Sequence, residues 1–69
     1  MSETVWQLAR AVVWATTCEE AAQAQDRLWE AVAPDMHLYH AAIWQAGLER
    51  AAYLHWERMH RTQSHESAA

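Results

Sequence analysis

Five histidines lie in the C-terminal half of the chain, and imidazole is a common metal ligand and proton carrier near neutral pH. The segment Glu57–His60 matches the pattern Glu-x-x-His, which places a carboxylate and an imidazole on one helical face, as di-iron carboxylate bundles require. A ferritin-like site needs two such segments and further Glu residues, so a dimer would have to assemble it. Metal binding across a dimer, through His37, His40, Glu57 and His60, is the alternative hypothesis; the leading hypothesis involves no cofactor.

Other side chains that could carry catalysis are few. The only cysteine, Cys18, lies at the expected start of a helix, but Glu19 and Glu20 beside it oppose a reactive thiolate. It is therefore predicted to be a small buried core residue. With one glycine the chain has no phosphate-cradling loop, and no serine lies in a strained elbow. We expect a protein that is not an enzyme.

Length, charge and cysteine content restrict the class of protein further. The chain has 69 residues and a formal charge of −4, which indicates one small domain and disfavours binding to the phosphates of nucleic acid. A single cysteine forms no intrachain disulfide, which favours a reducing compartment. The longest uninterrupted apolar stretch is residues 11–15, far too short to span a membrane. The expectation is a cytoplasmic protein, bacterial or phage in origin, without nucleic-acid or membrane partners.

The elements that must position these side chains are helices, because Ala, Leu, Glu, Gln and Arg dominate and only one Gly and one Pro occur. Ser2 is a candidate N-cap, and Thr17 with Glu20 forms a capping box. Pro34 ends the second helix. The sequence therefore predicts an all-α fold in which two short helices pack on one long C-terminal helix, with a single domain over residues 1–61. The expected helices cover residues 3–16, 18–32 and 35–61, and residues 62–69 form a polar disordered tail.

The expected third helix has two apolar faces. One, with spacing 4-3-4-3-4, is assigned to the core and consists of His37, Ala41, Trp44, Leu48, Ala51 and His55. The other lies far round the helix and consists of Tyr39, Ala42, Ala46, Tyr53 and His60. A three-helix monomer has no obvious use for the second face. Self-association or a partner would cover it.

The five tryptophans divide in the same way. Trp29 and Trp44 fall on expected core faces, whereas Trp14 lies among polar residues of the first helix. Trp56 projects from the third helix on the same side as Gln45. Large aromatic side chains are enriched at binding hot spots. The sequence therefore predicts a small non-catalytic interaction module (an adaptor, antitoxin-like regulator or phage-type inhibitor) that binds a protein or a second copy of itself. The predicted partner-binding residues are Trp14, Tyr39, Tyr53 and Trp56.

Overall fold

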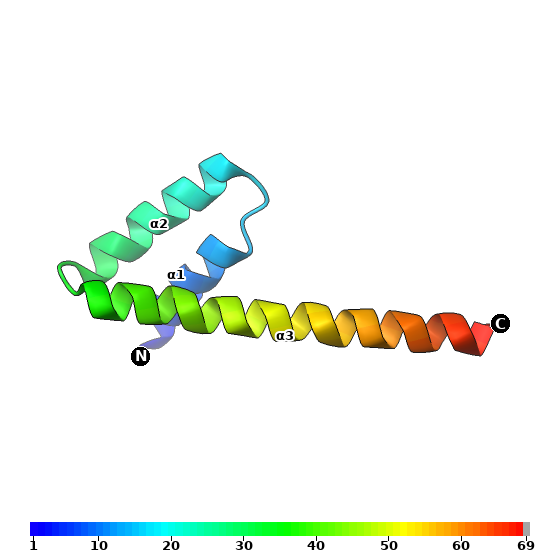
Figure 1. The fold of residues 1–69 in the computed structure, drawn as a ribbon. Helices are drawn as coiled ribbons and strands as arrows, with labels where there is room; N and C mark the ends of the chain where they lie inside the picture. The colour runs from blue at the N-terminus through cyan, green and yellow to red at the C-terminus, as the bar shows by residue number, and fades with distance from the viewer. Residues whose placement is uncertain (69) are drawn as a thin grey trace.

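The structure is a computed structural model that describes the backbone of residues 1–68 and the side chains of residues 1–61. It contains three helices, α1 (Glu3–Val13), α2 (Cys18–Val32) and α3 (Met36–Ala68), and no strand within the described backbone. The two short helices form a hairpin that packs on the N-terminal part of α3, and the rest of α3 projects beyond them (Figure 1). The predicted all-α fold, with two short helices on one long helix, is confirmed.

Side-chain caps begin the first two helices where the sequence predicts. The Ser2 hydroxyl accepts a hydrogen bond from the Val5 amide at 3.2 Å, and the Thr17 hydroxyl accepts one from the Glu20 amide at 3.1 Å. The Glu20 carboxylate does not return to Thr17 as a capping box requires. It accepts from the amide and hydroxyl of Thr16, at 3.1 and 3.0 Å. These bonds occupy Thr16 in the loop, and α1 ends at Val13 rather than at residue 16.

The corner between α2 and α3 follows from one proline. Ala33 has an extended backbone (ψ 144°), the conformation favoured immediately before proline, and α2 ends at Val32. The Asp35 carboxylate then accepts from the Leu38 amide at 2.9 Å and caps the first turn of α3. No Gly or Pro follows Gly47, and the α3 backbone continues to Ala68. The predicted tail, residues 62–69, therefore begins inside this helix; its side chains and all of Ala69 lie outside the described residues.

The core joins all three helices with mostly small side chains. Its buried members are Val5, Ala9, Leu28, Val32, Ala42 and Ala46. Among the described residues, Leu28 is the largest side chain that is fully buried. Partly buried residues surround this cluster: Leu8, Val12, Val13, Leu38, Tyr39 and Ile43. A core with so few large side chains leaves many of the bulky ones at the surface.

The predicted core face of α3 is wrong. The six residues assigned to it, His37, Ala41, Trp44, Leu48, Ala51 and His55, are all exposed. Trp44 is 69% exposed, more than any other large hydrophobic residue described. The residues of α3 that are buried are Ala42 and Ala46, which belong to the face that the sequence analysis left outside the core. Because Trp44 points about 160° away from both alanines, α3 is turned by nearly half a revolution from the expected orientation.

The size of the side chains at the helix crossing explains this orientation. Ala9 of α1 and Ala42 and Ala46 of α3 have no exposed surface, and residues of this size let helix axes approach to about 8–10 Å. An indole at the same crossing would hold the helices apart and leave voids around it. Hydrophobicity alone favours the face that contains Trp44, but close packing favours the alanines.

The inner face of α2 also differs from the prediction. Helical spacing in the sequence predicts an inner face of Cys18, Ala21, Ala22, Gln25, Leu28, Trp29 and Val32, of which Leu28 and Val32 are buried. Ala24 joins them, since it stands one turn before Leu28. Cys18 is exposed, so its prediction as a buried core residue is wrong. It lies in the first turn of α2, beyond the reach of the core.

Candidate protein-interaction surfaces

The structure brings three of the four predicted partner-binding residues together. Trp14 follows the last turn of α1, and its ring lies 5.4 Å from that of Tyr53 on α3 in an edge-to-face arrangement. The Tyr53 ring is 6.2 Å from Trp56, one helical turn further on. We call Trp14, Tyr53 and Trp56 the aromatic cluster. Their exposed fractions are 40%, 48% and 55%, so each ring contacts its neighbours and still presents much of its surface to solvent.

Charged groups border the aromatic cluster. The Arg50 guanidinium lies over the Trp14 ring, 5.4 Å from its centroid. Nearby, Arg10 of α1 donates two hydrogen bonds to the Glu49 carboxylate of α3, at 2.8 and 2.9 Å. The hydrogen bonding and charge of Glu49 raise the pKa of Arg10. This forked pair ties α1 to α3 beside Trp14 and so helps to fix the geometry of the cluster.

Tyr39 does not belong to the aromatic cluster. Its ring lies 5.6 Å from that of Trp29, nearly perpendicular to it, and the residue packs against the core. Trp29, predicted to be in the core, is instead at its edge and 36% exposed. Tyr39 is half-buried between α2 and α3, so less of its ring is available to a partner.

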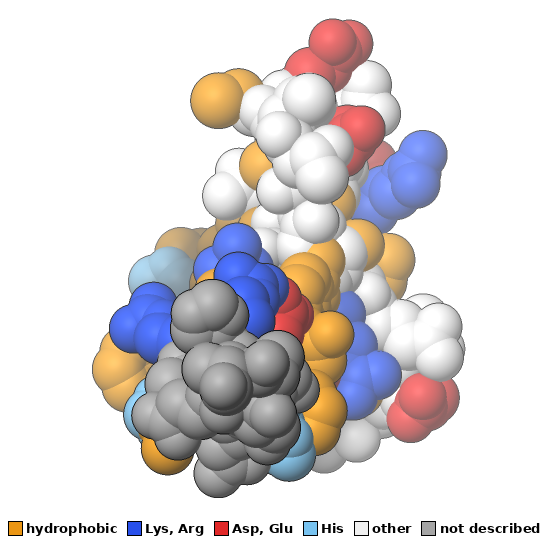
Figure 2. Space-filling model, turned by 90° about the vertical axis from the view of Figure 1, so that its right-hand side faces the viewer, with side chains coloured by type: hydrophobic (Ala, Val, Ile, Leu, Met, Phe, Trp, Pro, Cys, Tyr) orange, Lys and Arg blue, Asp and Glu red, His pale blue; other side chains and the backbone are white. Residues whose placement is uncertain are grey.

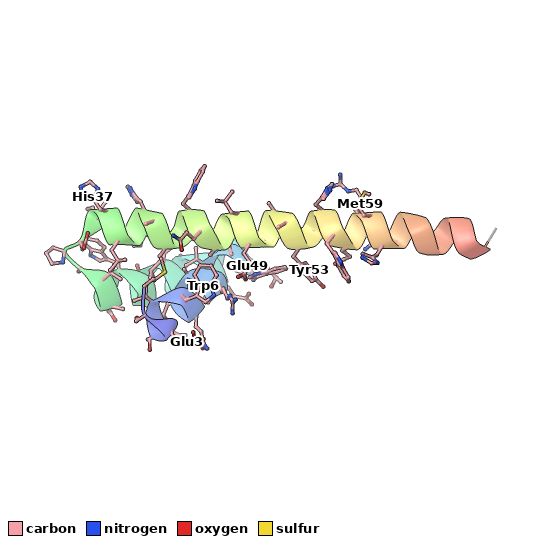
Figure 3. The ribbon with its side chains drawn as sticks, turned by 90° about the horizontal axis from the view of Figure 1, so that it is seen from below. Glu3, Trp6, His37, Glu49, Tyr53 and Met59 are labelled. Carbon is pink, nitrogen blue, oxygen red and sulfur yellow. The ribbon has the colours of Figure 1, made fainter. Side chains whose placement is uncertain are left out.

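A second apolar surface runs along the opposite side of α3, and sequence reasoning assigned it to the core. We call the six exposed residues His37, Ala41, Trp44, Leu48, Ala51 and His55 the outer stripe. Figure 3 shows Glu49 and Tyr53 on the side of α3 where the short helices lie, and His37 and Met59 on the other side. A shallow hollow lies beside the stripe, between it and the end of α1, and is lined by Val13, Ile43, Trp44, Gly47 and Leu48. The 4-3 spacing was visible in the sequence, but it does not say which of the two faces is covered within the chain.

The residues of the alternative metal hypothesis lie at two distant places. His37 and His40 stand in the first turns of α3, and Glu57 and His60 follow 20 residues later, about 30 Å along the helix. Glu57 accepts a hydrogen bond from Arg61, and the His60 ring lies 4.0 Å from that of Trp56. Within the side chains that the structure describes, no group of three His, Cys, Asp or Glu is placed to hold a metal ion.

The chain was compared with protein-family models, curated proteins and solved structures, and nothing matches it. Over the part of the chain that the structure describes, no helix is both long and apolar enough to cross a membrane.

Proposed function

We propose that this protein is a non-catalytic interaction module, of the kind found in small adaptors, antitoxin-like regulators and phage-encoded inhibitors. It binds a protein partner through the aromatic cluster and associates with a second copy of itself through α3. The observation that carries the proposal is the cluster: Trp14 at the end of α1 and Trp56 on α3 both contact Tyr53, and the three residues are each between 40% and 55% exposed.

The composition of the cluster supports binding to protein. Trp, Tyr and Arg are the residues most enriched at binding hot spots, and Arg50 adds a cation over the exposed indole of Trp14. Because the rings already contact one another, a partner would lose little free energy in ordering them. A Trp side chain that is 55% exposed offers roughly 80–140 Å² to a partner, or about 2–3 kcal/mol of apolar burial.

Affinity capture from cells of the source organism, followed by mass spectrometry, tests this function. Trp56→Ala should reduce recovery of the specific partner and weaken its affinity by roughly 30- to 150-fold. Trp44→Ala is the matched control, because it removes an exposed indole (69% exposed, against 55% for Trp56) from another face of the same helix. Circular dichroism should show unchanged helicity in both variants.

Two outcomes would contradict the proposal. One is recovery of the same proteins by the wild type and the Trp56→Ala variant in equal amounts. The other is unfolding by Trp14→Ala or Trp56→Ala, which would assign that indole to the core rather than to a binding surface. The expected result for Trp14→Ala is weaker binding with nearly intact helicity, since its ring is 40% exposed.

A further inference from the structure

We infer that α3 forms an antiparallel dimer with α3 of a second copy through the outer stripe, with Trp44 of each copy seated in the hollow over Gly47 of the other. This inference rests on the self-association through α3 that is part of the proposed function. It adds which face of α3 is used, the orientation of the two helices, and the residue, Trp44, that inserts into the hollow. The aromatic cluster lies on another side of the helix and stays open to a different protein.

The spacing of the outer stripe specifies a helix as its occupant. Residues spaced alternately by four and three form the seam along which two helices pack as a coiled coil. The stripe keeps this spacing from His37 to His55, and Trp44 and Leu48 at its centre are 69% and 54% exposed. The residues that flank its centre, Gln45 and Gly47, carry no charge. A second copy of α3 offers the same uncharged seam.

Gly47 provides an independent argument for close approach at this place. A glycine inside a helix costs about 1 kcal/mol relative to alanine. The chain's own packing does not require it, because a Cβ at Gly47 would meet nothing within 4 Å. When two antiparallel helices are centred between Trp44 and Leu48, Gly47 lies beside the twofold axis. The missing side chain there leaves the hollow that receives the indole of the second copy.

The separation of like charges favours the antiparallel orientation. Residues 1–35 contain two Arg and six Asp or Glu, a net charge of −4, whereas residues 50–61 contain three Arg and one Glu, a net charge of +2. Figure 2, which looks along α3 from its C-terminal end, shows Arg and His side chains around the projecting helix and acidic side chains mainly over the short helices.

In a parallel dimer Arg58, which continues the stripe one step beyond His55, would face the same residue of the second copy. In the antiparallel dimer the two Arg58 side chains lie at opposite ends of the seam, about 36 Å apart along the helix, because residue 58 then faces residue 34.

The available area suits a reversible dimer. The six residues of the outer stripe and the flanking Gln45 and Gly47, covering on average roughly 60–100 Å² each, would bury roughly 500–800 Å² per copy, near the lower end of the range for specific protein interfaces. We therefore expect association in the micromolar range, with monomer at the lowest concentrations.

Size-exclusion chromatography with light scattering tests the interface. The wild type should rise from 8.0 kDa towards twice that mass between about 1 and 500 μM. Trp44→Glu should stay at 8.0 kDa throughout, with unchanged helicity. The control Trp56→Glu, on the same helix but outside the stripe, should dimerise like the wild type. A wild type that stays monomeric, forms trimers or tetramers, or dimerises equally well with Glu at position 44 would overturn the inference.

Gly47→Gln gives a second test, in which the monomer should become more stable and the dimer weaker. Glutamine favours the helix more than glycine, so the variant monomer should melt at a higher temperature, whereas its side chain fills the hollow and should raise the dimer dissociation constant at least tenfold. A dimer that Gly47→Gln leaves unchanged or strengthens would exclude the seating of Trp44 over this residue.

The relative orientation of the two α3 helices can be measured as the distance between two spin labels, one on each copy. The labels are attached to the cysteine of a Met36→Cys variant in which Cys18→Ser removes the native thiol. In the antiparallel dimer the two labels lie about 30 Å apart along the helix, because residue 36 faces residue 56. In a parallel dimer they are separated only by the helix spacing of about 10 Å. A short distance would refute the antiparallel arrangement.

Failure of the dimer and failure of the proposed function can be distinguished. A monomeric wild type whose capture of a partner still depends on Trp56 refutes the dimer alone. A dimer that depends on Trp44, without any capture that depends on Trp56, refutes the role of the aromatic cluster alone.

Discussion

Replacing one of two leucines tests the rotational orientation of α3, on which both surfaces depend. Leu28 has no exposed surface and contacts the alanine-rich crossing, so Leu28→Ala removes buried methyl groups and leaves a cavity. Such changes cost about 2–5 kcal/mol. A chain of this length has a total stability of roughly 3–10 kcal/mol, so the variant should be close to unfolding at room temperature. A loss of 3 kcal/mol corresponds to a fall in Tm of roughly 12–24 °C.

Leu48→Ala is the matched control, because Leu48 is 54% exposed on the outer stripe. At concentrations where the protein is monomeric, its free energy of unfolding should change by no more than about 0.5 kcal/mol. The assay is chemical denaturation followed by circular dichroism, repeated at several protein concentrations. At high concentration Leu48→Ala should lose additional stability, since it weakens the dimer.

One result would refute the reasoning about α3. If Leu48→Ala destabilised the monomer as strongly as Leu28→Ala, independently of protein concentration, Leu48 would lie in the core. The face that contains Trp44 would then pack on the short helices, as hydrophobicity alone suggests, and the outer stripe would not exist.

Three further changes test local features of the fold. Thr17→Ala should destabilise the protein by about 1 kcal/mol in thermal denaturation, because the Glu20 amide loses its cap; Thr4→Ala serves as a control, since it replaces an exposed threonine that caps no helix. Gly47→Ala should raise the Tm of the monomer by roughly 2–8 °C, since nothing within the chain approaches a Cβ there; a lower Tm would reveal a close contact. Arg10→Gln and Glu49→Gln should show a favourable coupling in a double-mutant cycle of unfolding free energies, and the coupling should decrease with added salt; an additive cycle would show that the forked pair contributes nothing.

Local residue types were sufficient to predict the number and class of the elements. Ser2, Thr17 and Pro34 mark helix boundaries through the backbone groups that they satisfy or remove, and these effects operate within a few residues. The predicted second helix, residues 18–32, agrees at both ends with α2 (Cys18–Val32). The predicted end of the first helix, residue 16, is wrong, because the Glu20 carboxylate accepts hydrogen bonds from Thr16 and holds that residue in the loop. The carboxylate can reach either Thr16 or Thr17, and the sequence does not say which of the two it bonds.

The candidate site was partly predictable. Trp14 and Trp56 interrupt polar faces of their own helices, which is a local pattern, and both are exposed. Their meeting through Tyr53 could not be predicted, because it depends on where α1 crosses α3. Tyr39 shows the opposite case, since its face of α3 was expected to be open and the hairpin half-covers it.

The sequence by itself determined that this chain forms three helices, that the last of them has two apolar faces, and that its bulky side chains exceed what a small core can hold. Only the tertiary structure decided which face of α3 is covered. Both faces satisfy the helical period, so periodicity cannot choose between them; the choice comes from close packing of Ala9, Ala42 and Ala46, which brings the helix axes together and leaves Trp44 outside.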